Sequence, residues 1–209
     1  MVLIGGKPIL WHVMNIYASQ GFDDFVIAAG YKAEVIQDWV QDLQEPWNVT
    51  PLDTGLNTQT GGRIKKCIET FPEDRYFVTY GDGVGNIPLQ KLLNFHLERG
   101  GLATVTAVRP PARFGVLEIQ NGQVAHFGEK SQTDAGWING GFFVLEREVV
   151  DWISGDNVLF ETGPLPKLAQ KEKLSAFLHD GFWKPMDTLR EKRELDELAE
   201  LSVPPWLQN

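Results

Sequence analysis

Two kinds of apolar pattern occur along the first half of the chain, one with helical spacing and one of short continuous runs. Residues 9–20 place apolar side chains at the i, i+3, i+4 and i+7 spacing that is typical of an amphipathic helix. Residues 25–30 form a short apolar run that ends in glycine, which predicts a strand buried on both faces. Further helical patterns occur at 32–40 and 62–71, and strand-like runs, the second of them buried, at 49–52 and 76–80. Strands that alternate with helices predict an α/β fold with a mainly parallel central sheet.

The second half of the chain has a different pattern, which begins after a predicted helix at 89–98. Asn121-Gly122 lies between two β-type runs and is a strong hairpin signal, so this half should add antiparallel strands. The β-type runs lie at 103–108, 114–119, 123–127 and 141–145, and two more helices are expected at 160–170 and 188–201. No internal repeat or long linker is visible, so we expect a single domain over residues 1–209, with a mixed sheet flanked by helices.

Composition and charge exclude several classes of protein. The chain has 19 basic and 28 acidic residues and a formal net charge of −9, which argues against nucleic acid as a partner. The 43% of hydrophobic residues suffices for a full core, but no apolar run approaches the roughly 18 residues that would span a membrane. Cys67 is the only cysteine, so an internal disulfide and a thiolate metal cluster are excluded and a cytoplasmic location is expected.

Asp82 directly follows the strand predicted at 76–80 and lies between Gly81 and Gly83. In open α/β sheets ligands bind beyond the carboxyl ends of the strands, where glycines let a ligand approach the backbone. A carboxylate there is a natural Mg²⁺ ligand. An ordinary turn is the equal alternative, because aspartate and glycine are both turn residues.

Two other charged positions have stronger structural alternatives. Asp187 precedes the helix predicted at 188–201, where an aspartate is often an N-cap. Glu129 and Lys130 end a strand, and such adjacent opposite charges usually form a solvated surface. With support from another feature, Lys130 could neutralise a phosphate and Glu129 could accept hydrogen bonds from sugar hydroxyls.

Thr60-Gly61-Gly62 opens the helix predicted at 62–71. Free N–H groups at a helix N-terminus favour an anion or a ligand carbonyl. The segment does not have the spacing of a Walker phosphate loop, so its ligand stays open on this evidence alone.

These segments occur together with others in an order that resembles the sugar-1-phosphate nucleotidylyltransferases. The resemblance runs from residue 5 to the Pro204-Pro205-Trp206 tail and favours the cytidylyl branch of that family. It is carried by Trp47-Asn48-Val49-Thr50, Asp53-Thr54-Gly55, Thr60-Gly61-Gly62-Arg63, Arg113-Phe114-Gly115-Val116, Ile138-Asn139-Gly140-Gly141 and Trp183-Lys184-Pro185-Met186-Asp187-Thr188.

The resemblance implies a Rossmann-like nucleotidyltransferase fold and an enzyme that forms CDP-glucose from CTP and glucose 1-phosphate with Mg²⁺, for surface polysaccharide such as the O-antigen of lipopolysaccharide. Asp82 and Asp187 match the two carboxylates that hold the metal, and with Lys130 they match the catalytic positions. Positions that match nucleotide-binding residues are Thr60, Gly61, Gly62, Gly81 and Asp82. Positions that match sugar-phosphate-binding residues are Gly115, Glu129, Lys130, Asn139 and Gly140. Family members are commonly homo-oligomers, so we expect one here.

The sequence departs from the family pattern in three places. The family has a strand and a G-G-x-G-T-R-L phosphate loop before the position that Met1 matches. The family also has a longer segment between the positions of Trp39 and Glu45. This chain is shorter there, which predicts a tight connection to the next strand. In place of the family's E-K-P motif it has Glu129-Lys130-Ser131. Two alternatives therefore stay open, namely a relative that uses UTP or dTTP and an inactive module that binds a sugar nucleotide.

Overall fold

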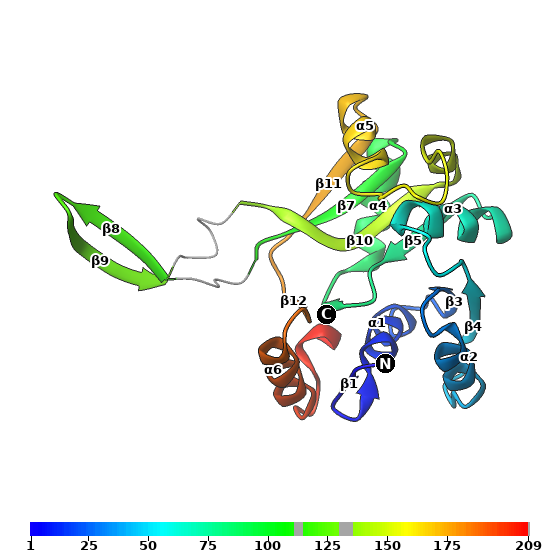
Figure 1. The fold of residues 1–209 in the computed structure, drawn as a ribbon, viewed down its shortest axis with the longest axis horizontal. Coiled ribbons are helices and arrows are strands. Elements are labelled where there is room, and N and C mark those ends of the chain that lie inside the picture. Colours follow the sequence, from blue (N-terminus) through cyan, green and yellow to red (C-terminus); the bar gives the residue numbers. More distant parts are fainter. Residues whose placement is uncertain (111–114, 130–135, 209) are drawn as a thin grey trace.

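The computed structural model describes residues 1–110, 115–129 and 136–208, and only the backbone within 115–119 and 126–129. Figure 1 shows the arrangement of its elements. The helices are α1 (Ile9–Ala18), α2 (Ala33–Gln41), α3 (Thr60–Thr70), α4 (Leu89–Arg99), α5 (Pro164–Gln170) and α6 (Leu189–Ala199), with 3-10 helices η2 (Arg147–Trp152) and η3 (Pro205–Leu207). The strands are β1 (Leu3–Ile4), β2 (Lys7–Pro8), β3 (Asp24–Ala29), β4 (Asn48–Asp53), β5 (Arg75–Thr79), β6 (Gly83–Gly85), β7 (Ala103–Val108), β8 (Gly115–Gln120), β9 (Gln123–Glu129), β10 (Ile138–Glu146), β11 (Leu174–His179) and β12 (Trp183–Pro185).

The largest sheet has four strands in the order β11-β7-β10-β5. The β11–β7 pair is parallel, whereas β10 runs antiparallel to both β7 and β5. The mixed α/β class is therefore confirmed, but the expectation of a mainly parallel sheet is wrong for these four strands. The reason is that the crossover through α4 sets β5 and β7 in the same direction, and β10 then fills the place between them with the opposite direction.

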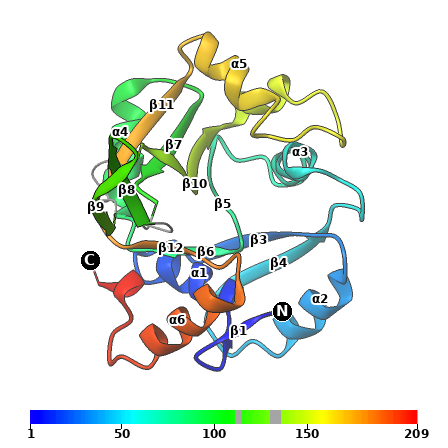
Figure 2. The same ribbon diagram turned by 60° about the vertical axis from the view of Figure 1, so that its left-hand side comes forward.

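The parallel pair β3–β4 forms a second, smaller sheet, with α2 packed against β4 (Figure 2). The expected shortage of chain before β4 does not arise. Residues 30–47 connect the two strands and include α2 itself, which exceeds the dozen or so residues that a parallel crossover needs.

The expectation that the run at 25–30 is buried on both faces is wrong, and the run at 76–80 is less buried than expected. In β3 the exposed Val26 alternates with the buried Ile27, and the residues of β5 are only half-buried. Each of these strands pairs with a single neighbour among the described residues. One edge of each strand therefore has no adjoining strand whose side chains could help to cover it.

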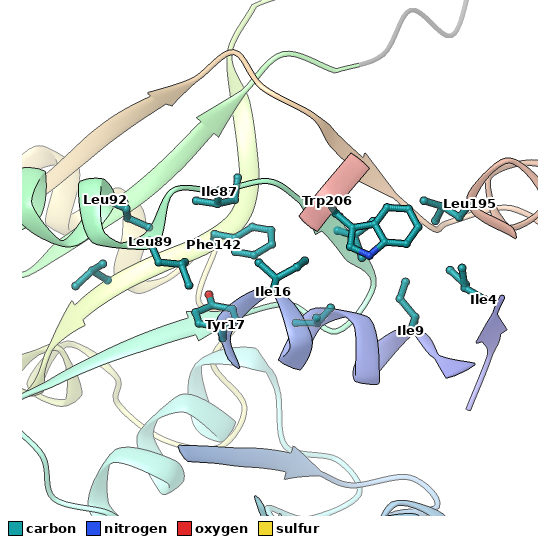
Figure 3. Close-up of a cluster of buried hydrophobic side chains, with 13 residues drawn as sticks. Ile4, Ile9, Ile16, Tyr17, Ile87, Leu89, Leu92, Phe142, Leu195 and Trp206 are labelled. Atoms are coloured by element: carbon teal, nitrogen blue, oxygen red, sulfur yellow. The ribbon is translucent and has the colours of Figure 1, made fainter. Parts of the chain in front are cut away.

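β10 is buried on both faces over most of its length. Phe142 and Val144 belong to one hydrophobic cluster and Phe143 and Leu145 to another, because successive side chains of a strand point to opposite faces. Figure 3 shows the first cluster, in which Tyr17 of α1 and Phe142 lie close to Ile87 and Leu89. The sheet thus separates two cores, and β10 contributes to both.

The hairpin predicted from Asn121-Gly122 is formed by β8 and β9. Both turn residues have positive φ, 52° and 80°, as a type I′ turn requires. Gln120 pairs with Gln123 across that turn. Figure 1 shows this hairpin projecting away from the other strands.

Most helices match their predicted positions, but one begins later than expected. The helix predicted at 160–170 begins at Pro164, a residue that is well suited to a first helical turn and cannot continue a helix from before it. No helix in the described part of the chain combines the length and the apolar character needed to cross a lipid bilayer.

The C-terminal η3 completes the first core, because Trp206 is 1% exposed and lies near Ile4 and Ile9 (Figure 3).

Trp206→Ala should lower the free energy of unfolding by about 3 to 5 kcal/mol through lost burial and the cavity left behind. Urea denaturation at one temperature measures the change. The matched control is Leu201→Ala, at a side chain that is 50% exposed, with an expected change within about 0.5 kcal/mol. Equal losses in both variants would contradict this account of the tail.

Candidate active site

Asp82 and Asp187 are brought together by a short antiparallel ladder between β6 and β12. Gly83 is paired with Pro185, and the Met186 N–H donates to the Asp82 carbonyl oxygen at 2.7 Å. Burial of the Asp82 carboxyl, and next the negative charge of Asp187, raise the pKa of Asp82. The ladder and this charge effect place both aspartates at the same end of the site.

Asp187 is not the N-cap of the helix that follows it. Thr188 holds that position, with its hydroxyl oxygen accepting from the Glu191 N–H at 3.2 Å while the Glu191 carboxylate accepts from the Thr188 N–H at 2.9 Å. The same carboxylate accepts from the Asp187 N–H at 2.8 Å. The capping box thus fixes the backbone of Asp187 and leaves the capping role to its neighbour.

The donor set around this pair suits Mg²⁺ better than a metal that needs a complete protein cage. The described residues contain no group of three or more histidine, cysteine, aspartate or glutamate side chains that could hold a metal ion. Mg²⁺ is commonly held by one or two carboxylates together with substrate phosphates and water. Two adjacent carboxylates fit that pattern, and the metal itself stays a prediction.

Gly81 lies where β5 leads into this ladder. A Cβ placed on it would meet no atom within 4 Å, and its φ is not in the left-handed region. Packing therefore gives no reason for glycine at this position, whereas a ligand that approaches the backbone would.

The N-terminus of α3 is held by the segment that follows η2. The Gly61 N–H donates to the Val158 carbonyl at 2.9 Å, and a Cβ on Gly61 would lie 2.6 Å from that oxygen. A Cβ on Gly62 would lie 2.6 Å from Asp156. The expectation of free N–H groups is therefore wrong for Gly61, because a neighbouring backbone already caps it, and both glycines have a packing reason.

An open pocket of ≈ 390 Å³ lies on the loop that leads into α3. It is lined by Leu56, Asn57, Thr58, Gln59, Thr60 and Arg63. The Arg63 guanidinium donates to the Ala29 carbonyl at 2.7 Å and to the Thr54 hydroxyl at 2.5 Å, at the carboxyl ends of β3 and β4. A positive charge thus borders a pocket of the size that small-molecule ligands occupy. Arg63 belongs to a motif noted in the sequence, but its positive charge was not given a role there.

Asn139 and Gly140 lie at the start of β10. The Asn139 side-chain oxygen accepts from the Gly141 N–H at 2.8 Å, and its amide donates to the Tyr80 hydroxyl at 3.4 Å. The Gly140 carbonyl accepts from the Trp183 indole at 2.8 Å. These contacts connect the start of β10 to β12 and to the end of β5, near Asp82.

Gly115 and Glu129 lie in the β8–β9 hairpin, where their backbones are paired. Figure 1 shows that hairpin away from β12, which ends two residues before Asp187, so the structure does not bring these residues together with the carboxylate pair. The side chain of Glu129 and the whole of Lys130 lie outside the described residues. Their roles toward the sugar phosphate stay predictions.

Tyr80 and Glu161 were missed by sequence reasoning. The Tyr80 hydroxyl donates to one Glu161 carboxylate oxygen, and the Thr60 hydroxyl donates to the other at 2.8 Å. Burial, and next the Glu161 carboxylate, raise the pKa of Tyr80, which keeps that hydroxyl protonated. The position of Tyr80 at a strand end could have signalled its role, but Glu161 has no local motif and lies 101 residues from Thr60.

Comparison with known proteins identifies the chain. A family model described as nucleotidyl transferase matches residues 1–189. The chain belongs to the nucleotidyl transferase family. It is 46% identical to the glucose-1-phosphate cytidylyltransferase of Salmonella typhi and 45% identical to that of Salmonella typhimurium, each over 99% of this chain and 89% of the relative. It is therefore a nucleotidyltransferase, of the kind that serves nucleotide-sugar biosynthesis.

A solved structure supports the fold. The crystal structure of HddC from Yersinia pseudotuberculosis matches with a TM-score of 0.75 at 24% identity, covering 94% of this chain and 88% of that one. At that identity the likeness shows the fold alone. The alignment to the Salmonella typhi enzyme has 229 positions, whereas this chain has 209 residues. The alignment therefore contains gaps on the side of this chain.

Gly61→Ala should destabilise the protein by about 1 to 3 kcal/mol, because the added methyl group would overlap the Val158 carbonyl. This cost exceeds the gain of about 1 kcal/mol that alanine brings inside a helix. Gly155→Ala is the control, since a Cβ there meets nothing within 4 Å. Urea unfolding of both variants tests the prediction, and a neutral Gly61→Ala would show that the capping segment can move aside without cost.

Proposed function

We propose that this nucleotidyltransferase transfers the cytidylyl group of CTP to glucose 1-phosphate and forms CDP-glucose and pyrophosphate. The observation that carries the proposal is the 46% identity, over 99% of the chain, to a glucose-1-phosphate cytidylyltransferase. The adjacent carboxylates Asp82 and Asp187 support it, because two anionic substrates that react together need a cation between them.

The proposed reaction needs no nucleophile from the protein. A phosphate oxygen of glucose 1-phosphate attacks the α-phosphorus of CTP in line, the bond to the β-phosphate breaks, and pyrophosphate leaves with the bonding electrons. The chain then contributes position and charge neutralisation. With a net charge of −9, it must supply that neutralisation locally.

The residues divide into a nucleotide part and a sugar part. Asp82 and Asp187 would hold Mg²⁺, which neutralises phosphate charge when bound. The pocket at Thr60 and Arg63 is the proposed place of the nucleotide, with Gly81 as a close backbone neighbour. Residues proposed for the sugar phosphate are Gly115, Glu129, Lys130, Asn139 and Gly140.

The activity is tested directly with purified protein, MgCl₂, glucose 1-phosphate and each of CTP, UTP and dTTP. Pyrophosphate release and chromatography of the nucleotide sugar measure the products. We expect CTP to be preferred and a chelator to abolish turnover. A preference for UTP or dTTP would assign a different relative, and tight binding of CDP-glucose without any turnover would assign a binding module.

The proposal extends to the setting of the enzyme. We expect it to work in the cytoplasm as a homo-oligomer and to supply a nucleotide sugar for surface polysaccharide such as the O-antigen of lipopolysaccharide. Light scattering of the purified protein tests the oligomer.

Asp82→Asn and Asp187→Asn should each lower kcat by about a hundredfold or more, because each removes a charge from the proposed metal site. The unfolding midpoint should stay equal or rise slightly, since one of two repelling carboxylates is removed. Steady-state kinetics and urea unfolding measure the two effects. Glu197→Gln, which removes an exposed charge from α6, is the control. Normal turnover in both aspartate variants would remove the pair from the site.

Lys130→Ala should raise the KM for glucose 1-phosphate by about tenfold or more and leave the KM for CTP within about twofold. The reason is that a lysine on the sugar phosphate stabilises charge on one substrate only. Lys171→Ala, at an exposed residue, controls for general loss of positive charge. Equal losses for both substrates, or no loss, would contradict the assignment of Lys130.

A further inference from the structure

Glu161 lies in a loop whose backbone is anchored on both sides. The preceding Phe160 is fully buried, with its ring centroid 5.8 Å from that of Phe143 in β10. The Phe160 carbonyl accepts from the Leu165 N–H at 3.0 Å. The position of Glu161 is therefore set by the second core, although its own side chain is polar.

The two carboxylate oxygens of Glu161 bind two different elements. One oxygen accepts from the Thr60 hydroxyl at 2.8 Å, at the first residue of α3. The other accepts from the hydroxyl of Tyr80, directly after β5 and two residues before Asp82. A single side chain thus connects the wall of the pocket with the strand end that leads to the carboxylate pair.

The direction of the Thr60 hydroxyl is fully determined. Its oxygen accepts from the Phe160 N–H at 2.9 Å, so its hydrogen is available for Glu161. The Tyr80 hydroxyl oxygen in turn accepts from the Asn139 amide at 3.4 Å. A chain of hydrogen bonds therefore runs from Asn139 through Tyr80 to Glu161. Thr60 donates to the second carboxylate oxygen of Glu161.

We propose that Glu161 is a positioning residue, which sets the separation between the nucleotide pocket at Thr60 and the reacting end of the site at Tyr80 and Asp82. The inference rests on the cytidylyl transfer proposed above. In-line transfer requires reacting atoms held about 3 to 3.5 Å apart, and an error of about 1 Å can cost a hundredfold in rate. A carboxylate that fixes two walls of the site at once serves that requirement without touching either substrate.

Glu161→Gln tests the proposal while keeping the size of the side chain. The amide offers one acceptor oxygen where the carboxylate offers two, so one of the two hydroxyl groups loses its partner. We expect kcat to fall by about tenfold to a hundredfold, with the KM for each substrate changed by less than about threefold. Glu148→Gln, an exposed glutamate in η2, is the matched control and should behave as wild type.

A double-mutant cycle separates positioning from a general loss of structure. If Glu161 acts through the Tyr80 hydroxyl, Glu161→Gln should add little to the loss of kcat already caused by Tyr80→Phe. Thermal unfolding of each variant shows whether the fold is intact. Independent, multiplicative losses of kcat, or a kcat that falls only as far as the folded fraction falls, would overturn the proposal.

The failure of this inference is distinct from failure of the proposed function. An active wild-type enzyme whose Glu161→Gln variant keeps a normal kcat would refute the positioning role alone. A wild-type protein with no transfer activity on any of the three nucleotides would refute both.

Discussion

The insertion of β10 between β5 and β7 is the interaction on which the rest of the structure depends. Its backbone bonds both neighbours in antiparallel registers, and its alternate side chains enter both cores. Through β5 it holds the strand that leads to Asp82, and its own first residues include Asn139 and Gly140. A strand that is hydrogen-bonded on both edges and buried on both faces is a rigid base for a site. The packing of β10 in the apolar interior therefore fixes the positions of Asn139 and Gly140 at its start.

The site joins parts of the chain that are far apart in sequence, and each junction is a short backbone or side-chain contact. A three-residue ladder joins β6 to β12, and one carboxylate joins α3 to the end of β5. The Salmonella relatives indicate which reaction such a site performs, and the contacts show how little chain is needed to assemble it. Chemistry by positioning and charge, without a protein nucleophile, depends on such junctions more than on any single reactive group.

Local sequence patterns predicted the positions of helices and strands well, but they predicted poorly which strands lie next to one another. The Asn121-Gly122 turn and the amphipathic spacing of α1 specify their own conformations, so they could be read directly from the sequence. The pairing of β10 with β5 and the exposed face of β3 depend on which strand lies alongside, which no local spacing encodes. In the same way, the strand-end position of Asp82 could be recognised, and resemblance drew attention to Asp187. Glu161 gives no such signal, because its role exists only once Thr60 and Tyr80 have been brought to it.

The close contact between the start of α3 and residues 156–161 restricts how this protein can change over evolution. Surface loops usually tolerate insertions and deletions. This loop lies so close to Gly61 and Gly62 that a Cβ atom added to either glycine would overlap it. A larger residue at either glycine becomes acceptable only after the loop has moved, and a moved loop would withdraw the carbonyl that caps Gly61. The two segments should therefore covary among homologues, with compensating changes that appear together and seldom singly.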